Sequence, residues 1–261
     1  MCATPIGNLD DCTFRLISTL KTVHLIAAED TRVTQKLLAH FGIKTPLLSL
    51  QKFNETQRKH SLAEKLLAGQ SIALVSDGGT PNIADPGAET VAFLREKGIP
   101  IVPIPGPSSV STFISVAGQL ANQFIFLGFL PKKPNDLLAA FKSAEPLGYP
   151  VVFFESPHRI TKTLELLQTH FKDARLSLGK ELTKHFETVL QTQNIAALSL
   201  PPAKGEWIGM LSFAPRVPDV AEAHAHLQAL KTLGLSQKQL VYVGQHLLNL
   251  PKNSLYKLTL K

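Results

Sequence analysis

The stretch Ile72-Ala73-Leu74-Val75-Ser76-Asp77-Gly78-Gly79-Thr80-Pro81, which continues to Asp85-Pro86-Gly87, decides the fold. Its first four residues are apolar and typical of a buried parallel strand, and a helical pattern starts near Ala88. A strand that leads through a glycine-rich polar loop into a helix is the usual arrangement of a ligand site in an α/β sheet. A connecting loop stiffened by prolines is the alternative, and this stretch alone does not choose between the two.

Strands and helices alternate on both sides of this stretch. Over residues 1–120 the patterns predict strands at 23–27, 46–50, 72–75 and 99–104, with helices at 13–20, 29–42, up to about 69, at 88–97 and after 109. Buried apolar strands separated by helices are typical of parallel sheets, so we predict an N-terminal α/β domain. Residues 121–215 predict a second α/β domain with a mixed sheet, and its strands are expected at 124–129, 151–154, 175–178 and 207–213.

The last part of the chain, 216–261, is expected to form a small basic helical module. Gly234 ends one helix, Ser236 to Gln239 form a capping box for the next, and a turn at 250–251 precedes a last helix at 254–260. The side chains expected to face inward are Leu227, Leu230 and Leu233 in the first helix, and Leu240, Tyr242 or Val243, and Leu247 in the second.

Composition excludes several classes of protein. The chain has 261 residues, 44% hydrophobic and 18% charged, which is enough for a substantial core. No apolar run approaches the roughly 20 residues of a membrane helix, and no signal peptide is visible, so we expect a cytoplasmic protein with no membrane partner. The two cysteines, Cys2 and Cys12, have no partner cluster, so neither a disulfide framework nor a metal site is expected.

Positive charge gathers near the C-terminus. The net charge is +7, and from Arg216 onward six basic residues face two acidic ones. This distribution suits a polyanionic partner such as nucleic acid, although an ordinary solvated helical surface is the alternative.

Several common catalytic signatures are missing. The sequence has neither the glycine fingerprint of dinucleotide-binding folds nor a P-loop, and its nine histidines form no H-E-x-x-H pair. Ser108 and Ser109 lack the glycine frame of a nucleophile elbow. Metal hydrolysis, phosphoryl transfer and serine hydrolysis therefore lack their motifs.

A series of loop motifs occurs in one order along nearly the whole chain. The motifs are Thr4-Pro5-Ile6-Gly7-Asn8-Leu9, Glu29-Asp30-Thr31-Arg32, the stretch 76–87, Pro105-Gly106-Pro107-Ser108, Gly128-Phe129-Leu130-Pro131, Phe154-Glu155-Ser156-Pro157-His158-Arg159, Glu181-Leu182-Thr183-Lys184 and Lys204-Gly205-Glu206. This series resembles the ribosomal RNA small subunit methyltransferase I family, a branch of the tetrapyrrole methylase superfamily. The tail at 250–256 is similar to the family's C-terminal module.

The resemblance implies two α/β domains that hold S-adenosylmethionine as methyl donor, and 2′-O-methylation of a decoding-region cytidine in 16S rRNA of the small ribosomal subunit. It also makes a homodimer the expected assembly. The donor-binding residues that it implies are Pro5, Asp77, Gly78, Thr80, Ser108, Ser109, Phe154, Glu155 and Met210.

Methyl transfer to a ribose hydroxyl needs in-line placement and a group that eases ionisation of the hydroxyl. The candidates near expected strand ends are Glu29, Asp30, Arg32, Asn54, Glu55, Lys180 and Glu181, and for each a helix cap or surface ion pair is the alternative. The residues expected to contact RNA are Arg159, Lys132, Lys133, Lys238, Lys252 and Lys257.

Three features depart from the family pattern. Only three residues precede Thr4, so either the given start is late or the first strand is clipped. Gln51-Lys52-Phe53 stands where relatives tend to carry histidines, so no histidine base is proposed there. The segment after Pro131 is short. Two other functions stay open: a methylase acting on a tetrapyrrole, against which the basic tail argues, and a non-catalytic RNA-binding or ribosome assembly protein.

Overall fold

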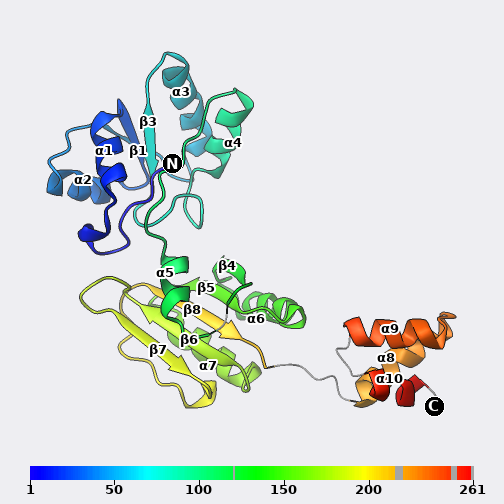
Figure 1. The fold of residues 1–261 in the computed structure, drawn as a ribbon. Coiled ribbons are helices and arrows are strands. Elements are labelled where there is room, and N and C mark those ends of the chain that lie inside the picture. Colours follow the sequence, from blue (N-terminus) through cyan, green and yellow to red (C-terminus); the bar gives the residue numbers. More distant parts are fainter. Residues whose placement is uncertain (120, 215–219, 248–251, 260–261) are drawn as a thin grey trace. The chain divides into compact units, whose positions relative to one another are not determined.

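The computed structural model describes residues 1–119, 121–214, 220–247 and 252–259 (Figure 1). The chain divides into two compact units, Met1–Ser212 and Phe213–Lys261. The expected start of the C-terminal module at 216 falls in 215–219, outside the described residues. The boundary expected near residue 120 stays a prediction, although the first unit has one sheet on each side of it.

A short parallel sheet occupies the N-terminal part of the first unit. Its strands are β1 (Leu25–Ala28), β2 (Leu47–Ser49) and β3 (Ile72–Val75), in the order β2-β1-β3. The chain start lies beside β3, where the Cys2 N–H donates to the Leu74 carbonyl at 2.9 Å and the Ala3 N–H donates to the Ile104 carbonyl at 3.1 Å. Strand pairing at the chain start consists of isolated bridges, between Cys2 and Ile104 and between Thr4 and Gly79.

The prediction of a strand at 99–104 is wrong. Only Ile104 pairs, in an isolated parallel bridge with Cys2. Prolines at 100, 103 and 105 remove backbone N–H donors from this segment, and a continuous ladder cannot form without them.

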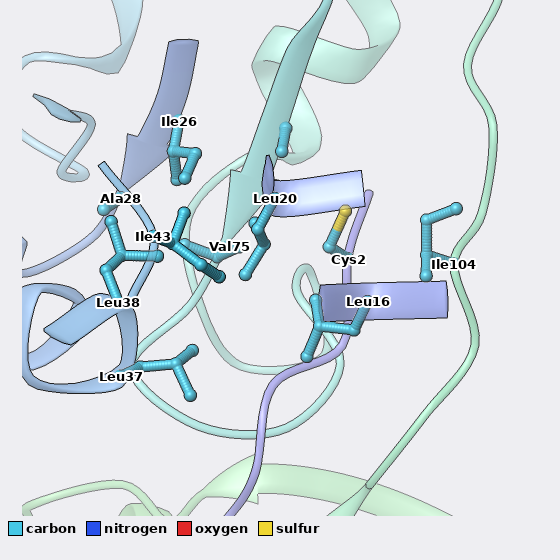
Figure 2. Close-up of a cluster of buried hydrophobic side chains, with 11 residues drawn as sticks. Cys2, Leu16, Leu20, Ile26, Ala28, Leu37, Leu38, Ile43, Val75 and Ile104 are labelled. Carbon is cyan, nitrogen blue, oxygen red and sulfur yellow. The ribbon is translucent and has the colours of Figure 1, made fainter. Parts of the chain in front are cut away.

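Helices cover both faces of the first sheet. On one face, α1 (Phe14–Thr22) and α2 (Thr31–His40) pack against Ile26, Ala28 and Val75 (Figure 2). On the other face, α3 (Glu55–Leu67) packs against Ala27 and Leu74, and α4 (Ala88–Glu96) packs on α3. Alternate strand residues point to opposite faces, so the sheet is buried on both sides, as expected for a parallel α/β arrangement.

The second sheet is mixed, as predicted. It has the order β4 (Ile125–Phe129), β5 (Val151–Glu155), β8 (Trp207–Ser212), β6 (Arg175–Lys180) and β7 (Thr188–Thr192), and only β4 and β5 run parallel. Strand β7 was not predicted, because its side chains at this edge are half-buried and form no apolar run. Short 3₁₀ turns lie at η1 (Leu9–Asp11), η2 (Glu145–Leu147) and η3 (Ile195–Ala197).

Both faces of the second sheet are also covered. Phe113 of α5 (Ser109–Val116) is fully buried against Val152 and Met210. On the opposite face, Phe141 of α6 (Pro134–Ala144) meets Phe153 edge to face, with ring centroids 5.5 Å apart, and α7 (Ile160–His170) adds Leu164 and Leu167 to the core.

The second unit contains α8 (Val220–Thr232), α9 (Gln237–Leu247) and α10 (Lys252–Thr259). The predicted capping box is confirmed, since Gln239 Oε1 accepts from the Ser236 N–H and hydroxyl at 2.8 and 2.7 Å. The expectation for Leu233 is wrong, because its side chain is 75% exposed rather than part of the buried stripe. Of the two alternatives on α9, Tyr242 is exposed and Val243 is half-buried, and Val241 is buried in the core of the unit. The expected turn at 250–251 and the side chain of Leu247 lie outside the described residues.

Candidate functional site

Loops from distant parts of the sequence meet at the carboxyl end of the first sheet. Thr4 and Gly79 exchange backbone hydrogen bonds at 3.0 and 2.9 Å. The Asp30 N–H donates to Asp77 Oδ1 at 2.9 Å, and the Thr80 hydroxyl donates to the Pro107 carbonyl at 3.1 Å. The loops at 4–9, 29–32, 76–81 and 105–108 therefore converge at one edge of the sheet.

Three carboxylates gather at this edge, and we refer to Glu29, Asp77 and Asp85 as the carboxylate cluster. Burial raises the pKa of Glu29, and the charges of Asp85 and Asp77 raise it further. Burial is also the main cause that raises the pKa of Asp77 and that of Asp85. Lys52 partly offsets the charges of Glu29 and Asp85, while its ammonium donates to the Ala84 carbonyl at 3.4 Å. Such a cluster favours a ligand that brings positive charge.

Asp30 belongs to the same edge but behaves differently. Hydrogen bonds from the Arg32 guanidinium, at 2.6 Å for the closest pair, lower the pKa of Asp30 to about 2. Asp30 also caps α2, by accepting from the Arg32 N–H at 2.8 Å. A carboxylate with so low a pKa is a weak proton acceptor, whereas the Arg32 side chain is 87% exposed and could meet an anionic partner.

Gly79 lets the loop at 76–81 approach the start of α5 closely. Gly79 has a φ of +86°, which suits glycine, and a Cβ on it would lie 3.3 Å from Ile6 Cγ2 and about 4.0 Å from Ser108 Cα. Ser108 precedes α5 and makes no side-chain capping bond. A helix N-terminus attracts negative charge. The loop at 76–81 therefore carries a carboxylate that attracts cations, Asp77, and lies close to a helix start that attracts anions.

The loop at 4–9 also reaches the second sheet. Ile6 packs against the buried cluster that contains Phe113 and Val152, and Phe154 lies half-buried in the same cluster. The ring of Phe154 contacts those of Phe126 and Phe129 at centroid distances of 5.2 and 5.4 Å. Phe154 therefore offers an aromatic surface on the face of the second sheet that the loop at 4–9 contacts.

The loop at 181–184 contacts the loop at 4–9 directly. The Asn8 N–H donates to Thr183 Oγ1 at 3.1 Å, and a Cβ on Gly7 would clash with Lys184. Glu181 and Thr183 have φ values of +49° and +65°, a strained backbone for residues other than glycine that often marks functional loops.

Lys184 and Glu206 support this loop and were not among the residues proposed from the sequence. Lys184 Nζ contacts Glu181 at 3.0 Å and Glu206 at 2.8 Å. Burial opposes the charge of Lys184, but the hydrogen bonds that its ammonium donates to Glu206 and Glu181 outweigh burial and raise its pKa. Burial likewise opposes the charge of Glu181, and the hydrogen bonds from the Glu206 N–H and Lys184 outweigh it and lower its pKa. The signal for these two residues, and for Asp85, was their presence in the quoted motifs.

Other candidates have structural partners. Glu55 is buried and accepts from the Thr90 N–H at 2.8 Å, which caps α4, and Asn54 accepts from the Gln51 N–H at 2.8 Å. Lys180 is buried and donates to the Pro202 carbonyl at 3.0 Å. A catalytic role for these three residues stays a prediction, but the structure places none of them in a contact with the carboxylate cluster.

Glu155 and Met210 are both enclosed by protein. Glu155 accepts from the Ser156 N–H, Arg159 Nη2 and the Thr163 hydroxyl at 2.7, 2.8 and 2.7 Å. Met210 is fully buried in the core of the second sheet. Their predicted donor contacts are untested, as is the RNA contact of Arg159; Lys132 and Lys133 are exposed, as such a contact requires.

Among the residues that the structure describes, no group of three or more His, Cys, Asp or Glu side chains is arranged to hold a metal ion. Across those same residues, every helix is too short or too polar to span a membrane.

Residues 2–197 match the family described as Tetrapyrrole (Corrin/Porphyrin) Methylases, so the chain belongs to the tetrapyrrole methylases. Solved structures share its fold. The methyltransferase CobJ has a TM-score of 0.60 and 15% identity over 84% of this chain and 98% of that chain. Diphthine synthase has a TM-score of 0.61 and 15% identity over 80% of this chain and 87% of that chain.

Curated relatives show to which branch of the tetrapyrrole methylases the chain belongs. The proteins named Ribosomal RNA small subunit methyltransferase I from Vibrio cholerae and Synechocystis sp. are each 40% identical to this chain. The matches cover 97% and 99% of this chain and 91% and 96% of the relatives. Within the tetrapyrrole methylases, the chain belongs to the ribosomal RNA small subunit methyltransferase I family.

Proposed function

We propose that this protein uses S-adenosylmethionine to methylate the 2′-hydroxyl of a decoding-region cytidine in the rRNA of the small ribosomal subunit. The observation that carries the proposal is the loop at 76–81, which contains Asp77 of the carboxylate cluster and, at Gly79, approaches Ser108 at the start of α5. Family membership and the names of the relatives supply the chemistry and the substrate class.

The residues present fit this donor. S-adenosylmethionine carries positive charge on its sulfur and ammonium groups and negative charge on its carboxylate, and it would supply a transferable methyl group. Asp77 is exposed at the strand end and offers its free carboxylate oxygen to a cation or a ribose diol. The start of α5, at Ser108 and Ser109, suits the carboxylate.

The remaining proposed donor contacts are backbone and apolar. Gly78 is exposed, and a Cβ on it would lie 3.3 Å from the Pro5 carbonyl oxygen, so the small residue keeps the loops at 4–9 and 76–81 close together. The half-buried ring of Phe154 suits a flat aromatic group such as adenine.

Glu29 is the group of the carboxylate cluster best suited to accept the ribose hydroxyl proton. Its raised pKa makes it a stronger base than Asp30, and its Oε2 is held by the Asp77 N–H at 3.4 Å. Most of the rate is expected to come from holding the hydroxyl in line with the transferred methyl group. Arg32, exposed beside this edge, would contact a phosphate of the RNA.

RNA binding is expected to use exposed lysines in both units. Lys132 and Lys133 contribute from the first unit, and Lys238, Lys252 and Lys257 from the second. We also propose that the enzyme works as a homodimer in the cytoplasm. Analytical ultracentrifugation of the purified chain tests the homodimer, since a monomer at working concentration contradicts it. Cell fractionation tests the location in the cytoplasm.

Incubation with methyl-labelled donor and unmodified small subunits tests the function. Label is expected in one cytidine of the decoding region, at a position that resists alkaline cleavage because the 2′-oxygen is methylated. Naked 16S rRNA and a precursor corrin serve as parallel substrates. Label on a base, label only in the corrin, or binding of subunits without transfer would each contradict the proposal.

A further inference from the structure

The second unit has a groove of about 670 Å³ along α9 and α10, and its lining contains Lys238 and Lys252, two of the lysines proposed to contact RNA. Five polar and aromatic side chains in its lining define what we term the Lys–Tyr groove: Lys238, Tyr242, Gln245, Lys252 and Tyr256. Tyr242 is 65% exposed and Tyr256 is 38% exposed. Large aromatic side chains that stay accessible within a groove are a feature of surfaces that bind a partner.

The two helices repeat the same pattern. Lys238 and Tyr242 are four residues apart on α9, and Lys252 and Tyr256 are four residues apart on α10. Residues at this spacing lie on one face of a helix, so each helix presents an ammonium group next to an aromatic ring. Gln245, three residues after Tyr242, adds an amide to the same face of α9.

Packing brings the two helices close together. Leu255 of α10 is fully buried, and it lies so near Gly244 of α9 that a Cβ on this glycine would clash with it. Leu240 and Val241 bury the inner side of α9 in the same cluster. The apolar sides of both helices are thus used within the unit, and the Lys–Tyr pairs are left at the surface.

The charge around the groove has one sign. From residue 223 to residue 261 the sequence contains five lysines and no aspartate or glutamate. Lys238 and Lys252 are both exposed. A polyanion therefore meets no acidic side chain from residues 223–261. An acidic peptide would pair with the lysines but would leave the tyrosine rings unused.

We propose that the Lys–Tyr groove binds an unpaired segment of RNA, with bases stacked on Tyr242 and Tyr256 and the adjoining phosphates paired with Lys238 and Lys252. Stacking on aromatic rings combined with lysines along the backbone is the general chemistry of single-strand recognition. Gln245 can hydrogen-bond the edge of a stacked base. This inference rests on the proposed function, because it takes the substrate to be rRNA.

Fluorescence anisotropy of the full-length chain with a labelled single-stranded oligoribonucleotide, over a salt series, tests the groove. Tyr242→Ala and Tyr256→Ala are each expected to weaken binding by about 5- to 150-fold, the range measured for loss of one stacked base. The Phe variants keep the ring and are expected to bind within about twofold of the native chain. Leu233→Ala, an exposed apolar change outside the groove lining, is the matched control.

The salt series separates stacking from charge. The Tyr→Ala variants are expected to keep the dependence of affinity on salt, whereas Lys238→Gln lowers its slope by about 0.7, the value for one phosphate contact on a single strand. Thermal melts check that each variant is folded. The proposal would be overturned if neither Ala variant weakened binding of the oligoribonucleotide. It would also be overturned if duplex RNA bound as tightly as the single strand and without dependence on the tyrosines. A third contradicting result would be tyrosine-dependent binding of anionic phosphatidylglycerol vesicles without any binding of RNA.

The failure of this inference differs from a failure of the proposed function. If the small subunit is methylated but both tyrosine variants bind the oligoribonucleotide normally, the groove proposal is wrong and the function stands. If binding depends on the tyrosines but no rRNA is methylated, the methylation proposal is wrong and the groove still binds RNA.

Discussion

Replacing Asp77 by Asn tests the carboxylate cluster most directly. The change removes a charge while keeping the size of the side chain and an oxygen that can still accept from the Asp30 N–H. A hydrogen bond to a charged group contributes about 1.5–3 kcal/mol, and partial exposure of Asp77 places the expected loss at the lower end, about 1–2 kcal/mol. The donor Kd should therefore rise by roughly 5- to 30-fold.

The thermal stability of the Asp77→Asn variant should stay unchanged or increase, although its affinity for the donor falls. A carboxyl group whose pKa is raised on folding stabilises the protein fully below its unfolded pKa of about 3.9, and that contribution is lost as the pH rises through the folded pKa. At pH 7 the ionised Asp77 therefore opposes folding beside Glu29 and Asp85. Without this charge, the melting temperature should stay constant or rise by about 2 °C at most.

Two measurements at pH 7 test this prediction: isothermal titration calorimetry with the donor, and a thermal melt without it. Asp173→Asn, which makes the same charge change at an exposed turn between α7 and β6, is the control and should alter neither quantity. An unchanged donor Kd for Asp77→Asn would refute the proposed site. A fall of several degrees in the melting temperature would show that Asp77 is a structural carboxylate.

Three further predictions concern stability and protons. Glu155→Gln removes the charge of the buried partner of the half-buried Arg159, so chemical denaturation should show a loss of about 2–4 kcal/mol, and an unaltered midpoint would contradict this. Gly209→Ala places a Cβ against the ring of Phe153 and should cost about 1–3 kcal/mol in the same assay, while a neutral result would mean that the ring can move. Donor binding should release protons just above about pH 4, because the positive charge of the donor favours the ionised form of the carboxylate cluster. Calorimetry in buffers of different ionisation enthalpy detects this release, and binding heats that do not depend on the buffer would argue against it.

Local patterns predicted much of the fold. Apolar runs located β1, β3 and β5 to within a residue or two, and the mixed character of the second sheet was also expected. The errors have physical causes. At 99–104 an apolar run suggested a strand, but its prolines cannot donate to a ladder; at β7 a half-buried edge strand has no apolar run to reveal it.

The candidate site could be predicted only in part. Loop motifs and their order identified the family and placed polar residues at strand ends, where a parallel α/β topology gathers them at one edge. The sequence by itself therefore determined the kind of site and its general position. The sequence could not show which carboxylates have structural partners and which are available for a ligand, because all of them stand near the end of a strand or helix.

Only the tertiary structure decided which carboxylates are left without sufficient partners. Glu55 caps α4, Glu155 accepts hydrogen bonds from neighbouring residues, and Asp30 is ion-paired with Arg32. The charge of Glu29, in contrast, is opposed by those of Asp77 and Asp85. The physical reason is that the ionisation of a buried acid depends on its burial and on charges from segments far away in the chain, and the fold alone brings these together.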